Sequence, residues 1–551
     1  MNDLEQFAGQ FGKSQALSFP EYCLKHIILD DLTPYDVYNR PYMAEIVKTS
    51  FKHPNSVVSK GAQTGFSTYY LARAMYMVDV LGANLIYYLP TDKLAIRFGE
   101  TRFDPYVDRS EYLKSRLMGT DKAGLKQIGT HFFYMLGLHG KGGAISIPAD
   151  EILFDEVALI NRENMDLAQD RILASKLGWQ RYFSAPLFEE DGIDELYRQS
   201  DMRKWLVKCS GCNHYSIVEE DFPDNILETK DSDKRSIRII CSKCGKPLDV
   251  AQGKWVPEHP DKTDETIGYR VPQLIIPDAR LDLIWSRWKR AQGKPNKLAL
   301  VRRSALGIAD SGNMQPINST TLQLVEAAGD YYFQDSSEEA CGIGIDMGDA
   351  AHVAVLAPYK EDGFRIVAAW HVDVEDLLEM IPHLEETYNV GCLVIDAMPY
   401  KTESKRVVRI LQTATGYIQY FKQNYKESTE GEEEKQVNVI QVDRDESLDE
   451  TTELFGCNPP RALLFKPRNI EEENTLEEIR RQLKKLLKEE IIGADSNKRI
   501  SYKKNVENHF GMAINSGRIA LNQMGVHGKK KGPAISGGQV IGRSLASDIH
   551  W

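Results

Sequence analysis

Apolar and polar positions alternate in blocks along the first third of the chain. The stretch SVVSK at 56–60 is a short β-rich run; a glycine-containing loop follows it, and FSTYYLARAMYMVDVL at 66–81 has apolar residues at helical spacing. This order predicts a strand, a loop and a helix. Buried strands are also predicted in NLIYYLPTD at 84–92, ILFDE at 152–156 and RYFSAP at 181–186. Together these segments predict a parallel-type sheet whose strand ends meet at one site.

A second series of predicted strands begins near residue 341. GIGIDMG at 342–348 is followed by HVAVLAPY at 352–359, FRIVAAWHV at 364–372 and CLVID at 392–396. A first strand with an aspartate, followed by two more strands and a helix, is typical of the start of an RNase-H-like fold. The fold class that we expect is therefore α/β and multidomain.

Three charged segments lie in this last third. KESTEGEEEKQ at 426–436 is predicted to be a solvated loop. IEEENTLEEIRRQLKKLLKEEI at 470–491 is predicted to be an amphipathic helix that packs on the sheet. The glycine-rich basic end at 526–551 is predicted to be a flexible tail.

Length and composition limit the function classes. At 551 residues, the chain is too long for one hydrophobic core, and 42% hydrophobic with 27% charged residues is typical of a globular protein. The N-terminal residues lack the features of a signal peptide, and no apolar stretch is long enough to span a membrane, so we expect a cytosolic protein without a membrane partner. The net charge of −12 argues against a surface covered with basic patches, but it does not exclude a local nucleic-acid groove.

Four of the eight cysteines form two pairs with metal-ligand spacing, Cys209 with Cys212 and Cys241 with Cys244. Two such pairs can complete a tetrahedral Cys₄ site, and four thiolates leave no open position for a substrate. The pattern predicts a zinc ribbon with a structural Zn²⁺; four buried free cysteines are the alternative. His214 is close enough in the sequence to compete as a ligand.

The loop SKGAQTGFST resembles a phosphate-binding loop with its lysine in another place. In GxxxxGK[ST] a lysine follows the last glycine, whereas here Phe66 stands there. Gly65 takes the place of the second glycine, Ser67 that of the Mg²⁺-binding hydroxyl, and Lys60 that of the first glycine, from which it can fold back over the phosphates. An ordinary glycine turn before a helix is the alternative. The predicted nucleotide-binding set is Lys60, Gly61, Gln63, Gly65, Phe66, Ser67 and Thr68.

Two carboxylates end the strand ILFDE. Asp155 is placed to orient Mg²⁺ through water, and Glu156 to activate the water that attacks the γ-phosphate. A strand that runs into an acidic turn is the alternative interpretation. We therefore expect ATP with Mg²⁺ as the cofactor.

The ordered set of motifs resembles the large terminase subunits of tailed bacteriophages, of the lambda-like type. The matching segments are KGAQTGFS, YYLPTDKLAIRFGETRFDPYV, ILFDEV and SAPLFEEDGIDELYRQSDMRKWLVKCSGC. The resemblance implies a P-loop ATPase that translocates double-stranded DNA into a procapsid, with Lys60 as a variant loop lysine. It also implies that Ser184 to Pro186 couple hydrolysis to movement. Because relatives often have arginine where this chain has Gln63, Arg97 and Arg102 are candidates for a finger donated in trans; exposed helix arginines are the alternative.

Partners follow from the same resemblance. They are a portal protein, a small terminase subunit and further copies of this chain in a ring on the procapsid, in the host cell cytoplasm. Contacts with DNA phosphates would be salt-dependent and largely independent of sequence.

The resemblance also implies a nuclease that cuts concatemeric DNA. Asp346 and Asp396 end two predicted strands and could share Mg²⁺ or Mn²⁺. Such nucleases usually have a further acid near the C-terminus, but in NHFGMA at 508–513 Met512 occupies its place. Glu507 is the predicted replacement, and Asp349 and Asp548 are alternatives.

The expected organisation has five parts. They are a motor domain of the RecA/ASCE-like type at 1–200, a zinc-ribbon insertion at 201–255, a helical linker at 256–335, a nuclease domain at 336–525 and a tail at 526–551. The expected function is DNA packaging by an ATPase with a nuclease. The alternatives are an active motor with a silent or weak nuclease, and a DNA-binding scaffold whose two sites have decayed.

Overall fold

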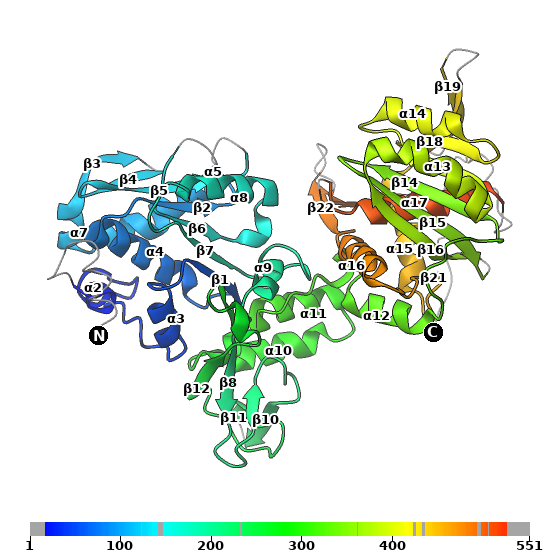
Figure 1. Ribbon diagram of the computed structural model, residues 1–551. Helices are drawn as coiled ribbons and strands as arrows, with labels where there is room; N and C mark the ends of the chain where they lie inside the picture. The colour runs from blue at the N-terminus through cyan, green and yellow to red at the C-terminus, as the bar shows by residue number, and fades with distance from the viewer. Residues whose placement is uncertain are drawn as a thin grey trace, which may run out of the picture. The chain divides into compact units, whose positions relative to one another are not determined.

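The computed structural model describes residues 17–525, apart from 123, 141–146, 232–233, 361, 423–425, 432–435, 493–497 and 505. It divides into two compact units, an N-terminal unit up to Asn313 and a C-terminal unit from Met314 (Figure 1). The predicted tail at 526–551, which includes Asp548, lies outside the described residues. Among the described helices, none combines the length and the apolar character needed to cross a bilayer.

The N-terminal unit is built on an eight-stranded mixed sheet. From β13 to β5 all neighbouring strands are parallel, and β4 and β3 add an antiparallel edge. In sheet order the strands are β13 (Ile267–Val271), β1 (Asn55–Lys60), β7 (Trp179–Ser184), β6 (Glu151–Asp155), β2 (Leu85–Leu89), β5 (His131–Gly137), β4 (Leu125–Ile128) and β3 (Leu117–Lys122). The central strands are buried along almost their whole length, as is typical of parallel strands covered on both faces. The four strands predicted from apolar runs are confirmed.

Helices surround this sheet. They are α2 (Phe19–His26), α3 (Met43–Thr49), α4 (Phe66–Tyr76) with the π-helix η1 (Met77–Leu81), α5 (Asp92–Phe98) with η2 (Gly99–Phe103), α6 (Asp104–Asp108), α7 (Glu111–Arg116), α8 (Arg162–Gln169) and α9 (Ile193–Gln199). The helix predicted after the glycine loop is thus α4 and η1.

A buried ionic cluster joins three of these elements. Glu151 at the start of β6 lies between Arg73 of α4 and Arg181 of β7, with 2.9 Å from Arg181 Nε to Glu151 Oε1, and all three side chains are fully buried. Both arginines also donate to the carbonyl of Ser50. Because β6 and β7 lead to the predicted catalytic turns and α4 begins at the glycine loop, the cluster fixes these elements relative to one another.

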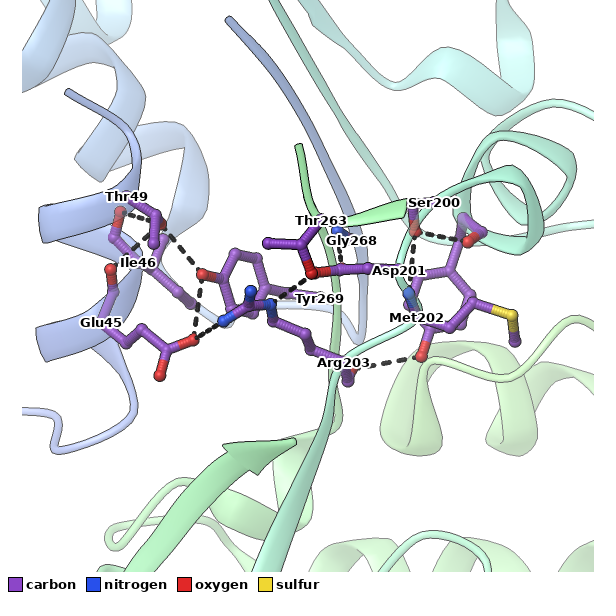
Figure 2. A network of polar contacts seen from close by, with 11 residues as sticks. Glu45, Ile46, Thr49, Ser200, Asp201, Met202, Arg203, Thr263, Gly268 and Tyr269 are labelled. Carbon is purple, nitrogen blue, oxygen red and sulfur yellow. Dashed lines mark hydrogen bonds and ion pairs between the residues drawn. The ribbon is translucent and has the colours of Figure 1, made fainter. Parts of the chain in front are cut away.

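A small β module follows α9. Strands β8 (Lys204–Lys208), β9 (Tyr215–Ile217) and β12 (Gly253–Val256) form one sheet, and β10 (Ile226–Asp231) and β11 (Lys234–Ile239) form a hairpin. At its base, Arg203 donates to Asp201 at 2.8 Å and also to Glu45 of α3, and Tyr269 of β13 contacts the same glutamate at 3.3 Å (Figure 2). The module is therefore anchored by polar contacts to the main sheet of this unit.

The segment predicted as a helical linker contains one strand of the main sheet. Its helices are α10 (Leu281–Ala291), α11 (Pro295–Val301) with the π-helix η8 (Arg302–Leu306), and α12 (Ser319–Ala328). Before them, β13 pairs with β1 along its full length. Pairing with a distant strand cannot be recognised from a local pattern.

The C-terminal unit contains a second eight-stranded mixed sheet. Strands β16, β15 and β14 are antiparallel neighbours, whereas β14, β17, β18 and β20 are parallel. In sheet order the strands are β19 (Lys426–Glu430), β20 (Val437–Val442), β18 (Thr415–Phe421), β17 (Val390–Asp396), β14 (Cys341–Met347), β15 (Ala351–Tyr359), β16 (Gly363–Val372) and β21 (Ala462–Leu463); β22 (Lys488–Ile492) and β23 (Lys498–Tyr502) form a separate hairpin.

Among the described residues of this unit, five helices follow α12: α13 (Val374–Tyr388), α14 (Lys401–Ile410), α15 (Arg444–Gly456), α16 (Ile470–Lys484) and α17 (His509–Gln523). Helix α17 packs on β14, β15 and β17. A Cβ on Gly344 of β14 would lie 1.9 Å from the carbonyl oxygen of Ala513, so glycine is required for this close approach.

The charged run at 426–436 is not only a loop. Its first part is β19, which pairs antiparallel with β20, and residues 432–435 lie outside the described residues. Glu430 at the end of β19 contacts Lys401 and Lys405 of α14. The prediction of a solvated loop was wrong for this part, because pairing with β20 satisfies the backbone hydrogen bonds of this polar strand. The predicted helix at 470–491 is confirmed only for its first part, α16, which packs near β16 and ends at Lys484; residues 488–491 belong to the strand β22, so the prediction was wrong there.

Candidate functional site

The glycine loop connects β1 to the N-terminus of α4. Gln63 and Gly65 have positive φ angles of 56° and 87°. The backbone N–H groups of residues 66–68, in the first turn of α4, have no partner within that helix, whose first bond runs from Tyr69 N to Gly65 O. Consecutive unpaired N–H groups at a helix N-terminus form a site for an anion such as phosphate.

Hydrogen bonds from other segments of the chain fix the rest of the loop. Gly61 N donates to Val271 O at 2.9 Å, and Ala62 N to Ser304 O at 2.7 Å. Arg40 donates to the carbonyl of Thr64, and its Nη1 lies 2.6 Å from the position that a Cβ on Gly65 would take. Sequence reasoning missed Arg40, which places a second cation beside the loop; no local pattern distinguishes it.

Ser67 and Asp155 form the predicted Mg²⁺ side of this site. Ser67 Oγ donates to Asp155 Oδ2 at 3.0 Å, and the Tyr87 hydroxyl donates to the same oxygen at 2.7 Å. A hydroxyl and a carboxylate are hard oxygen ligands, which fit Mg²⁺ when phosphate oxygens and water supply the others. Tyr87, from the neighbouring strand β2, is a further residue that sequence reasoning missed.

Lys60 and Glu156 form the other side. Lys60 is 7% exposed, and its Nζ lies 3.7 Å from Glu156 Oε1. Glu156 has a left-handed conformation with φ 56°. Burial raises the pKa of Glu156 above its usual value, the charge of Lys60 opposes this shift, and Asp155 adds to it. A carboxylate with a raised pKa beside a phosphate site can accept a proton from water near neutral pH.

Ser184 ends β7 next to this turn. Its Oγ accepts a hydrogen bond from Ala158 N at 3.3 Å, two residues after Glu156. Arg97 on α5 and Arg102 on η2 are exposed. The structure therefore brings the loop, both acids and Ser184 together and leaves the two arginines accessible.

The four paired cysteines converge in the small β module. Their four sulfur atoms lie within 4.8 Å of one another, with 3.6 Å between Cys209 and Cys244 and 3.7 Å between Cys212 and Cys241. His214 is not a member of this group; its backbone carbonyl accepts from Cys209 N. Four thiols at these separations fit a tetrahedral zinc ion after a small expansion.

Asp346 and Asp396 lie at the carboxyl ends of the adjacent parallel strands β14 and β17. Because Ile345 pairs with Ile395, the two aspartates that follow them lie side by side where the two strands end. Burial, and then the charge of Asp346, raise the pKa of Asp396 to about 7, which the charge of Arg444 opposes. Two close carboxylates in a buried place lose this repulsion when they share a divalent cation.

A methionine, not an acid, occupies the position where the motif predicts a third acid. Met512 lies in α17 and is 7% exposed. Glu507 forms a two-pronged ion pair with Arg481 at 2.7 and 2.8 Å, and this pairing lowers its pKa. His509, two residues after Glu507, has its Nδ1 2.7 Å from Asp346 Oδ2, and this contact raises the pKa of His509.

Part of the N-terminal unit matches a known protein family. Residues 31–256 match the model described as the phage terminase large subunit gpA, ATPase domain. Comparison with curated proteins finds no match.

Solved structures that are similar to this chain include one large terminase and two large-terminase domains. The large terminase of bacteriophage HK97 has 8% identity and a TM-score of 0.48, and the match covers 91% of this chain and 98% of that one. The large terminase ATPase domain of a Thermus phage has 15% identity and a TM-score of 0.30, over 51% and 98%. The large terminase nuclease of thermophilic phage G20c has 12% identity and a TM-score of 0.24, over 37% and 96%. Over residues 31–256, which is less than half of its length, the chain is therefore similar to the ATPase domain of the phage terminase large subunit gpA.

Proposed function

We propose that this chain is the motor of viral DNA packaging, in which ATP hydrolysis drives double-stranded DNA into a procapsid. The observation that supports this most directly is the loop at 61–65, where the N–H groups of residues 66–68, which have no partner within α4, adjoin a lysine and two acids. Such a loop, with a cation on one side and an acid pair on the other, suits a nucleotide triphosphate.

In the proposed mechanism the loop N–H groups and Lys60 hold the phosphates. Ser67 and Asp155 would hold Mg²⁺, which neutralises charge that develops on the phosphate oxygens. Lys60 moves from Glu156 to the phosphates on binding, since its 3.7 Å contact with Glu156 is loose. Glu156 is then free to take the proton from the attacking water.

Movement would begin at Ser184, because its hydroxyl contacts the turn that follows Glu156. Arg97 or Arg102 of a neighbouring copy would complete the site in a ring, as exposed arginines can reach another subunit. The four-cysteine module would be a structural zinc ribbon. The proposed partners are DNA, a portal protein and a small terminase subunit, in the host cell cytoplasm.

We also propose a metal-dependent nuclease at Asp346 and Asp396, with Mg²⁺ or Mn²⁺ as the cation. The raised pKa of Asp396 and the parallel register of β14 and β17 support a shared cation. Glu507 is the proposed third acid and must leave Arg481 to act. An active motor with a weak or silent nuclease is the second candidate, and the burial of Met512 at the expected acid position favours it.

The test of the motor is the substitution Glu156→Gln. We expect it to abolish ATP hydrolysis and to leave ATP binding intact, since the loop and Lys60 are unchanged. Glu111→Gln, at an exposed position of α7, is the matched control. Phosphate release and binding of a fluorescent ATP analogue measure the two steps. Unchanged turnover in Glu156→Gln would remove this glutamate as the base.

A further inference from the structure

Three side chains from separate elements of the C-terminal unit converge beside the carboxylate site. β15 and β16 pair with His352 directly opposite His371, and their rings stack with centroids 4.4 Å apart. Glu478 of α16 reaches both rings: its Oε1 lies 3.4 Å from His352 Nε2 and 3.4 Å from His371 Nδ1. The three donor atoms all lie within 4.8 Å of one another. Neither the motor nor the proposed nuclease carboxylates use these residues.

We propose that His352, His371 and Glu478 bind a divalent cation of the zinc class. Metal–ligand bonds of about 2.0 to 2.2 Å in a tetrahedral site place neighbouring ligand atoms about 3.3 to 3.6 Å apart. The two separations from Glu478 Oε1 match this edge length. Two imidazoles and one carboxylate are the ligand set of zinc sites that keep a fourth position open.

Gln482, one turn along α16, orients the site. Its Nε2 donates to Glu478 Oε1 at 2.8 Å and lies 3.3 Å from His352 Nε2. Its Oε1 accepts from Phe510 N, which fixes the direction of the amide. His352 Nε2 thus faces a carboxylate acceptor and an amide donor, and a neutral ring nitrogen can satisfy only one of them. A cation at this nitrogen removes the conflict, because the ring lone pair and the carboxylate both point to the metal.

The open position faces a cavity. The three ligands line a space of about 210 Å³ together with Asp349, Ala350, Glu507 and His509. Water or a phosphate oxygen can therefore complete the coordination. His509 stacks on His352 with centroids 4.9 Å apart and also contacts Asp346, so one ring separates this site from the first nuclease carboxylate.

The direct test is metal content of the full chain, purified without an affinity tag and dialysed against micromolar Zn²⁺. We expect the wild type to hold one zinc ion more per chain than His371→Ala or Glu478→Gln. His371 is 45% exposed, so its replacement does not threaten the fold. His383→Ala, on the exposed face of α13, is the matched control and should keep the full content. Equal zinc in the wild type and both ligand variants would overturn the proposal.

The four-cysteine group is a second metal site, so the two must be told apart. In Cys241→Ser, a Co²⁺-loaded chain should lose the thiolate-to-cobalt charge-transfer band but keep the weaker visible bands of a nitrogen and oxygen site. Adding His371→Ala to this variant should remove those bands as well. A featureless spectrum of Cys241→Ser would show that the three residues are only hydrogen-bonded. Neither readout depends on DNA cleavage, so failure of the proposed nuclease would leave this result unchanged.

Discussion

The charge of Asp396 should destabilise the metal-free C-terminal unit at alkaline pH. Its pKa is raised from 3.8 to about 7, first by burial and then by Asp346. A folded-state pKa above the unfolded value means that ionisation disfavours the folded state. The cost is absent below about pH 4, increases as pH rises, and levels off above pH 7. At about 1.4 kcal/mol per pKa unit it reaches about 4 kcal/mol, of which about 2 to 3 kcal/mol appears between pH 5 and pH 8.

Asp396→Asn removes this cost and keeps the side-chain shape. We expect the variant to be more stable than the wild type without added divalent cation, with a larger gain at pH 8 than at pH 5. For a unit of about 200 residues, each kcal/mol corresponds to about 2 to 4 °C in melting temperature.

Thermal unfolding of the full chain measures the gain in melting temperature. Hydrogen exchange in the peptide that contains β17 then measures the gain in stability at that strand. Asp376→Asn on α13 is the control, because this exposed carboxyl should show no such dependence. Added Mn²⁺ should make the wild type more stable than Asp396→Asn, because the two aspartates of the wild type then bind the cation. The same gain at both pH values, or no gain, would refute the buried repulsion between the two aspartates.

Three further outcomes are expected. Glu151→Gln should lower the free energy of unfolding of the N-terminal unit by about 3 to 5 kcal/mol in urea, because it leaves two buried arginines without their carboxylate; a loss below about 1 kcal/mol would mean that water enters the cluster. Cys241→Ser should remove about one zinc ion per chain and expose the β module to protease, whereas Cys457→Ser should do neither. With Mn²⁺, the wild type should cut plasmid DNA, Asp346→Ala should not, and Glu507→Ala should cut at least about tenfold more slowly; cleavage by Asp346→Ala would disprove the assigned site, and no cleavage by the wild type would favour the silent nuclease.

Local patterns predicted much of the N-terminal unit. The strands around residues 57, 87, 153 and 182 were identifiable because parallel strands covered on both faces are continuous apolar runs. The cysteine pairs were identifiable because metal-ligand spacing is local, and the structure brings all four sulfurs together. The role of each residue in catalysis stays a prediction.

Pairing over long distances could not be predicted. The strand β13 lies far along the chain from its partner β1, and β19 is a charged segment that only its neighbour β20 makes a strand. Both strands depend on hydrogen bonds to another part of the chain, which a local sequence pattern does not indicate.

The sequence by itself determined which chemistry the chain has available: a lysine before a glycine loop, an acid pair after a strand, four cysteines in two knuckles, and two aspartates at strand ends. Only the tertiary structure decided what surrounds each group. It placed Arg40 at the glycine loop and Tyr87 at Asp155, paired Glu507 with Arg481, and brought His352 together with His371 and Glu478. The physical reason is that spacing along the chain controls contacts within one element, whereas burial, pKa and ligand geometry depend on side chains that arrive from other elements.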